Sequence, residues 1–193
     1  VATVRHRERL DELQAKYQIA TTLNNRDAVQ DADVVLLCVK PQATREVLKE
    51  LADALRAEQL VISIVASVTT KFIEERLHNK VPVVRSMPNT PCLVGAGMSS
   101  ICAGSFATPE HLDLAKNIFD HVGRTMVLDE KYFDAVTGLG ASGPGFMYVV
   151  IEALAEGGVK VGLLRKVATE LAAQACLGAA QMAIQTAQHP AVR

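Results

Sequence analysis

Short, continuous apolar runs alternate with polar stretches of helical period over residues 1–128. The runs lie at 1–4, 33–39, 60–65, 81–85 and 123–128, with a further strand expected at 97–102. Runs that lack polar alternation are typical of strands buried on both faces of a parallel sheet. We therefore predict a strand at each of these places and expect the run from Asp33 to Val39 to be buried on both faces.

Between the runs, apolar residues recur every three or four positions, which predicts amphipathic helices. Val47, Leu48, Leu51 and Leu55 form one such stripe, and further helices are expected around 10–17, 68–77 and 109–121. Strands that alternate with helices of about 10–15 residues indicate an α/β fold with a doubly wound, Rossmann-type sheet.

The pattern changes after Asp129, where helices are expected at 131–138, 146–159 and 163–188. The last of these is apolar almost all round, and a helix without a polar face must be buried. The few helices in this part of the chain cannot bury it by themselves, so we expect it to pack against a second subunit. The chain is thus expected to divide into a dinucleotide-binding domain at 1–128 and an all-helical dimerisation and substrate domain at 129–193.

The composition excludes several classes of function. The 20 Lys and Arg residues balance 21 Asp and Glu residues, a formal net charge of −1, and the chain has no Trp. That balance argues against a nucleic-acid partner. No apolar run approaches the roughly 20 residues of a spanning helix, so no membrane partner is expected. Four cysteines without a metal or redox spacing favour a reducing, cytoplasmic compartment.

Candidate chemistry lies where the predicted strands end, since doubly wound sheets bind ligands beyond the carboxyl ends of their strands. Arg5 follows the first run directly, a position from which an arginine can bind the 2′-phosphate of NADP. The alternative is an ordinary solvated charge run, because residues 1–3 cannot supply the glycine-rich phosphate turn. Lys40 follows the next run and offers one ammonium to a phosphate or carboxylate.

Two further loops have residues suited to ligand binding. Residues 87–91 form a proline-flanked loop in which Asn89 and Thr90 can hydrogen-bond to an amide or a ribose. Ser142, Gly143 and Pro144 open a helix whose free backbone N–H groups suit a substrate carboxylate. A rigid structural loop and an ordinary capped helix start remain the alternatives. No metal-ligand cluster is found and no catalytic residue is assigned.

Several stretches, in this order, resemble the pyrroline-5-carboxylate reductase family. They are residues 32–41 (ADVVLLCVKP), 84–91 (VRSMPNTP), 134–139 (DAVTGL), 142–144 (SGP), 156–163 (EGGVKVGL), 177–182 (LGAAQM) and 188–190 (QHP). The resemblance implies NAD(P)H-dependent reduction of 1-pyrroline-5-carboxylate to L-proline, the last step of proline biosynthesis. It implies a homodimer or higher homo-oligomer, with NADP(H) as cofactor and NAD(H) as the alternative.

The resemblance also implies the site residues. Those expected to border the cofactor are Arg5, Asn25, Val39, Lys40, Pro41, Ala66, Met87, Pro88, Asn89 and Thr90. His6 and Arg7 are further candidates for the 2′-phosphate. Those expected to line the substrate pocket are Ser142, Gly143 and Pro144.

The chain departs from the family pattern at several positions of the expected site. Ser67 stands where the family usually has glycine, Ala141 adds a methyl group before the substrate helix, and Gly140 lacks the hydroxyl of the serine that the family usually has there. The resemblance also implies a strand with a glycine-rich turn ahead of Val1 and a further substrate loop after Arg193. We therefore expect these 193 residues alone to bind cofactor poorly. The alternatives are a non-catalytic dimerisation or binding module derived from such a reductase, and a related hydroxyacid-dehydrogenase-type reductase.

Overall fold

The computed structural model describes residues 1–186, and the chain divides into two compact units, Val1–Ala141 and Ser142–Arg193. The helix end expected near residue 188 and the family-like residues 188–190 lie outside the described residues. The predicted domain limits at 128 and 129 stay a prediction.

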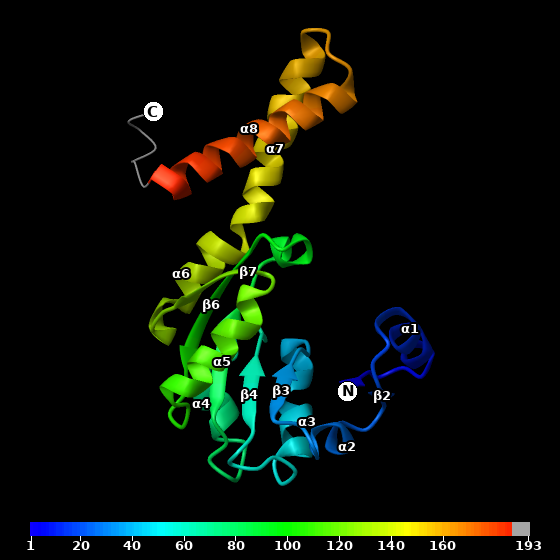
Figure 1. Cartoon of the computed structure of the whole chain (residues 1–193), viewed down its shortest axis with the longest axis vertical. Coiled ribbons are helices and arrows are strands. Elements are labelled where there is room, and N and C mark those ends of the chain that lie inside the picture. Colours follow the sequence, from blue (N-terminus) through cyan, green and yellow to red (C-terminus); the bar gives the residue numbers. More distant parts are fainter. Residues whose placement is uncertain (187–193) are drawn as a thin grey trace. The chain divides into compact units, whose positions relative to one another are not determined.

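The first unit is built around parallel strands (Figure 1). A two-stranded sheet pairs β1 with β2, and a five-stranded sheet has the order β3-β4-β5-β6-β7. The strands are β1 (Ala2–Thr3), β2 (Thr21–Thr22), β3 (Val34–Leu37), β4 (Leu60–Ser63), β5 (Val83–Met87), β6 (Gly97–Ala103) and β7 (Gly123–Val127). The helices among them are α1 (Glu8–Tyr17), α2 (Asn25–Val29), α3 (Pro41–Leu51), α4 (Thr70–Glu74) and α5 (Pro109–Asp120). The predicted alternation of strands and helices is confirmed.

The sheet is mixed, because β6 runs antiparallel to β5 while the other neighbouring pairs are parallel. The chain between β5 and β6 consists of a short 3₁₀ helix, η1 (Thr90–Val94), and a few flanking residues. A parallel connection needs a crossover of about a dozen residues or more. This link is too short for one, so the chain turns back beside β5.

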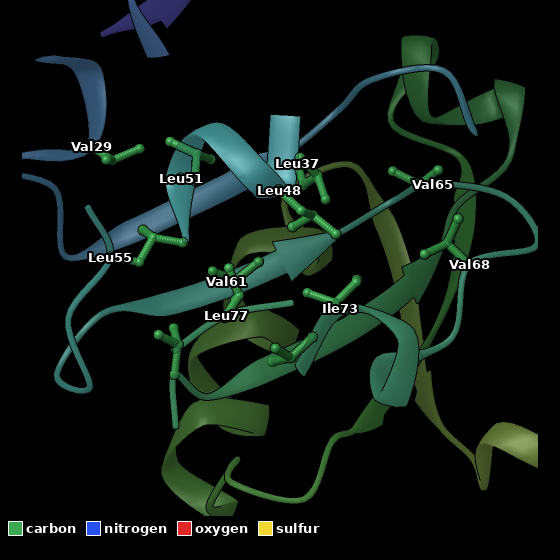
Figure 2. Packing of buried hydrophobic residues seen from close by; sticks show 12 residues of the cluster. Val29, Leu37, Leu48, Leu51, Leu55, Val61, Val65, Val68, Ile73 and Leu77 are labelled. Atoms are coloured by element: carbon green, nitrogen blue, oxygen red, sulfur yellow. The ribbon is translucent and has the colours of Figure 1, made fainter. Parts of the chain in front are cut away.

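Alternate residues of the central strands face two separate cores. Val61 and Val83 belong to one cluster, together with Leu48 and Leu51 of α3 and with Leu55, which follows that helix (Figure 2). A second cluster packs side chains of β4, β5 and β6 against α5; its buried members are Leu60, Ile62, Val84, Ile101, Ala115 and Phe119. A sheet with a core on each face is the doubly wound arrangement that the apolar runs predict.

The prediction that the run from Asp33 to Val39 is buried on both faces is wrong for β3. The Leu36 side chain is 50% exposed, and β3 lies at an edge of the five-stranded sheet. Leu36 lines a cavity of about 560 Å³ together with residues of β1, α2 and α3, so the space on this side of the strand is not filled by side chains.

The remainder of the chain is helical. The first unit ends with a 3₁₀ turn, η2 (Glu130–Tyr132), the short helix α6 (Phe133–Val136) and a π-helical turn, η3 (Thr137–Ala141). The second unit pairs α7 (Gly143–Lys160) with α8 (Arg165–Thr186). Arg165 forms ion pairs with Glu152 and Glu156 of α7.

Small side chains form the contact between α7 and α8. The buried residues of this unit are Ala155, Ala168 and Ala172, and a Cβ added at Gly158 would lie 3.0 Å from the Ala168 Cβ. Ile151 and Val159 also pack against this cluster, while other large apolar side chains remain outside it, with Leu171 58% exposed. An apolar surface of this kind in a single chain favours the predicted packing against a second subunit.

We expected no segment long and apolar enough to span a membrane. Judged by length and composition alone, that expectation is wrong. The stretch Glu130–Lys160 and the helix Arg165–Thr186 both meet those two criteria. The core helices of soluble proteins meet the same criteria. The predicted cytoplasmic location stays a prediction.

Candidate functional site

The carboxyl ends of β3, β4 and β5 place most of the expected cofactor residues along one edge of the sheet. These strands are parallel and adjacent, so the segments that follow them lie side by side at that edge. Val39, Lys40 and Pro41 follow β3, and Ala66 follows β4. Met87 is the last residue of β5, and residues 88–90 follow it. The structure thus gathers residues that are up to about fifty positions apart in the sequence.

Arg5 and Asn25 are brought to the β3 end of this edge. They line a cavity of about 340 Å³ together with Val39, and Glu46 and Glu50 lie on its α3 side. Asn25 does more than border the cavity: its Nδ2 donates to Glu50 Oε2 at 2.9 Å, which ties α2 to α3. Arg5 lies two residues after the end of β1 and is exposed. It is the one cationic residue among the described residues that line this cavity.

Lys40 and Pro41 open α3. Lys40 is the exposed N-cap residue, its carbonyl accepts a hydrogen bond from Thr44 Oγ1 at 3.2 Å, and Pro41 occupies the first helical position. A fixed φ at that position suits the start of a helix. The Lys40 ammonium consequently stays at the edge, with no ion pair to a carboxylate within residues 1–186.

The segment that follows β4 contains an unusual backbone conformation. Ser67 has a φ of +60°, in the left-handed region, and is exposed. A residue with a Cβ is disfavoured there by about 1–2 kcal/mol, whereas glycine is not. The position that departs from the family pattern is therefore one where the backbone itself favours glycine.

Asn89 joins the loop after β5 to two other segments. Its Oδ1 accepts from Met98 N at 2.9 Å, at the start of β6, and its Nδ2 donates to the Gly140 carbonyl at 3.0 Å, in the π-helical turn. Gly140 lies two residues before Ser142 in the chain. Sequence reasoning assigned the Asn89 amide to a ligand and missed this structural role, which no local signal reveals.

A buried ion pair fixes the segment that leads into that turn. The side chain of Arg85 in β5 is 5% exposed, and its Nη1 lies 3.0 Å from Glu130 Oε1. Glu130 also accepts from Thr70 N and Thr70 Oγ1, each at 2.8 Å, while the Arg85 guanidinium stacks 4.6 Å from the Phe133 ring centre. Arg85 is the one charged residue in the apolar run 81–85, and this feature of the sequence could have indicated a buried ion pair.

The same network affects a buried cysteine. Cys102 pairs with Arg85 across β5 and β6, and burial raises the pKa of its thiol to about 12, with a further contribution from the Glu130 carboxylate. A thiol with so high a pKa stays protonated near neutral pH and is a poor nucleophile. Cys102 is therefore a core residue and not a candidate for catalysis.

The expected substrate residues begin the second unit. Ser142 is the N-cap residue of α7, Gly143 is its first residue, and Pro144 lies in its first turn. Gly145 N donates to the Ser142 carbonyl at 2.9 Å. A Cβ at Gly143 would meet no atom within 4 Å in the described chain, so the backbone at this helix start is open on that side.

Two family models match separate parts of the chain. One is described as pyrroline-5-carboxylate reductase dimerisation and matches residues 130–193. The other is described as NADP oxidoreductase, coenzyme F420-dependent, and matches residues 1–67. The dimerisation match covers both long apolar helices.

Individual proteins resemble the chain over most of its length. A pyrroline-5-carboxylate reductase from Methanosarcina acetivorans is 45% identical over 94% of this chain and 67% of its own. The structure of a pyrroline-5-carboxylate reductase from Coxiella burnetii is 37% identical with a TM-score of 0.90, covering 98% of this chain and 71% of that one. The Plasmodium falciparum pyrroline carboxylate reductase, solved with NADP bound, is 28% identical with a TM-score of 0.83, covering 91% and 66%.

Proposed function

The chain belongs to the pyrroline-5-carboxylate reductase family, and we propose that it binds NADP(H) along the carboxyl edge of β3, β4 and β5 for the reduction of 1-pyrroline-5-carboxylate to L-proline. The observation that supports this most strongly is the gathering of Lys40, Ala66 and the 87–90 loop at one edge, with Arg5 and Asn25 at its β3 end.

The residues at this edge fit a phosphate-bearing dinucleotide. Arg5 and Lys40 are exposed cations, and neither forms an ion pair within residues 1–186. Cations without an acidic partner are available to phosphate oxygens. When bound, the reduced nicotinamide supplies the hydride that adds to the C=N carbon of the substrate.

The chain's own residues act by binding and orienting. Arg5 holds the 2′-phosphate, Lys40 a phosphate of the linking pyrophosphate, and the start of α7 holds the substrate carboxylate. Asn89 fixes the loop that borders the nicotinamide, through its bonds to Met98 and Gly140. Positioning of this kind supplies much of the rate enhancement in a transfer between two bound molecules.

The test is consumption of NADPH by the full-length protein in the presence of pyrroline-5-carboxylate, with proline measured as the product. Proline formed in equal amount to the NADPH consumed supports the proposal. A folded oligomer that binds NADPH without turnover would favour the non-catalytic module, and turnover of 2-hydroxy acids instead would favour the hydroxyacid-dehydrogenase type.

Replacing Arg5 with alanine is expected to raise the KM for NADPH about tenfold and to leave the KM for NADH unchanged. A hydrogen bond to a charged group contributes about 1.5–3 kcal/mol, and only NADPH carries the 2′-phosphate. Arg9→Ala is the matched control, because Arg9 is an exposed arginine already paired with Glu12 at 3.4 Å. Equal effects of Arg5→Ala on the two cofactors would contradict the assignment.

The family assignment supports homo-oligomerisation, and we propose that α8 forms part of a dimer interface. Replacing the exposed Leu171 with glutamate is expected to raise the dimer dissociation constant by at least about tenfold, because it buries an unpaired charge. Sedimentation at several protein concentrations measures this, with Glu170→Gln as the control on the same helix. A Leu171→Glu protein that dimerises normally would place the interface elsewhere.

A further inference from the structure

Three residues other than glycine adopt a left-handed backbone within residues 1–186. They are Gln18, Ser67 and Lys80, with φ values of +54°, +60° and +51°. Gln18 is the C-cap of α1, and its N–H donates to the Gln14 carbonyl, which is a common way to end a helix. Lys80 lies in the turn ahead of β5, away from the carboxyl edge. Ser67 is the one of the three that lies at the edge where the cofactor is proposed to bind.

The strain at Ser67 has no compensating bond in the described part of the chain. The neighbouring hydroxyl groups are engaged: Ser63 Oγ accepts from Val65 N at 3.3 Å, and Thr69 Oγ1 accepts from Phe72 N at 3.1 Å. The Ser67 hydroxyl has no hydrogen-bond partner in residues 1–186, and the N–H groups of Ala66 and Ser67 likewise have no acceptor there. A strained residue beside unpaired donors at a strand edge points to a functional contact.

The position of the segment after β4, which contains Ala66 and Ser67, indicates which part of a bound dinucleotide it contacts. The cavity lined by Arg5 and Asn25 lies at the β3 end of the edge, and the loop after β5 contains Asn89, which is bonded to the turn before the substrate helix. The segment after β4 lies between these two places. When the 2′-phosphate lies at Arg5, the nicotinamide half of the cofactor, beyond the pyrophosphate, passes Ser67. The polar groups of that half are the ribose hydroxyls and the carboxamide.

We propose that the Ser67 hydroxyl hydrogen-bonds to the nicotinamide half of bound NADP(H), at a ribose hydroxyl or the carboxamide, and that this contact is why a serine is retained in a left-handed conformation. The inference rests on the proposed cofactor site. It assigns to this chain a polar cofactor contact that a glycine could not make. Ser67 therefore contributes to cofactor affinity at a cost in stability of the free protein.

The experiment compares Ser67→Gly and Ser67→Ala with the natural full-length protein, by thermal unfolding without cofactor and by the Kd for NADPH from fluorescence quenching. Ser67→Gly is expected to raise Tm by a few degrees, because it relieves the strain, and yet to raise the Kd about threefold to tenfold through loss of one hydrogen bond. Ser67→Ala keeps the Cβ, so its Kd rises equally with no gain in Tm.

Gln18→Gly and Lys80→Gly are the matched controls, since they relieve the same backbone strain away from the edge. Both should raise Tm and leave the Kd unchanged. A Ser67→Gly protein that binds NADPH as tightly as the natural one, or a Ser67→Ala protein of natural affinity, would overturn the inference while leaving the proposed function intact. A natural protein that binds no NADPH would overturn both.

Discussion

Replacing Glu130 with glutamine is expected to lower the free energy of unfolding by about 2–4 kcal/mol. The substitution removes the counter-charge of Arg85, whose side chain is 5% exposed and lies 3.0 Å from the Glu130 carboxylate. It also disturbs the two bonds that the carboxylate accepts from Thr70 at the start of α4. The loss is large because a buried guanidinium is left without a partner of opposite charge.

Chemical denaturation of the natural and variant proteins measures this effect. Glu75→Gln is the control, because Glu75 pairs with Lys71 on the surface at 3.8 Å and such pairs contribute about 0–1 kcal/mol. If the single variant does not fold, the double variant Arg85→Met with Glu130→Leu, which removes both charges, is expected to recover much of the lost stability. A Glu130→Gln protein within about 0.5 kcal/mol of the natural one would contradict the prediction, because the ion pair would then contribute no more than an exposed one.

The two faces of the sheet could be predicted from the sequence because burial leaves a periodic pattern. Leu48 and Leu51 of α3 and Leu55 just beyond it recur at helical spacing, and all three are at most 3% exposed. Leu36 shows the limit of such reasoning. An apolar run predicts a buried strand, but the run does not tell which residues of an edge strand are left exposed. The antiparallel pairing of β6 was likewise not predicted from the apolar pattern, although the short connection between the runs 81–85 and 97–102 could have indicated it, since a parallel crossover needs about a dozen residues or more.

The edge that gathers Lys40, Ala66 and the 87–90 loop follows from the parallel order of the strands, which the alternation of elements predicts. The role of each residue at that edge cannot be predicted from the alternation of strands and helices. Asn25 and Asn89 were both expected beside the cofactor, and the structure gives each a bond to another segment of the protein. Contacts between residues 25 or 51 positions apart leave no periodic trace in a single sequence, so such roles need coordinates.

Asn89 is the position where a single substitution is expected to reduce catalysis most. Asn89→Leu removes the bond to Met98 N and the bond to the Gly140 carbonyl, and leaves both partly buried groups unpaired. The expected loss of stability is about 2 kcal/mol, since one unpaired buried group costs about 1–3 kcal/mol. Release of the 87–90 loop and of the turn before Ser142 is expected to lower kcat/KM about a hundredfold, because displacements near 1 Å have that effect.

Asn79→Leu is the matched control for Asn89→Leu. The Asn79 Nδ2 donates to the Leu55 carbonyl at 2.7 Å, a bond of the same type between an asparagine and a distant backbone carbonyl, but away from the carboxyl edge. The control should lose about 1 kcal/mol of stability with an unchanged kcat/KM. Asn89→Asp then separates the two bonds, because its carboxylate still accepts from Met98 N but repels the Gly140 carbonyl. If Asn89→Asp is as active as the natural protein, the bond to Gly140 has no part in positioning, and the bond to Met98 alone holds the loop.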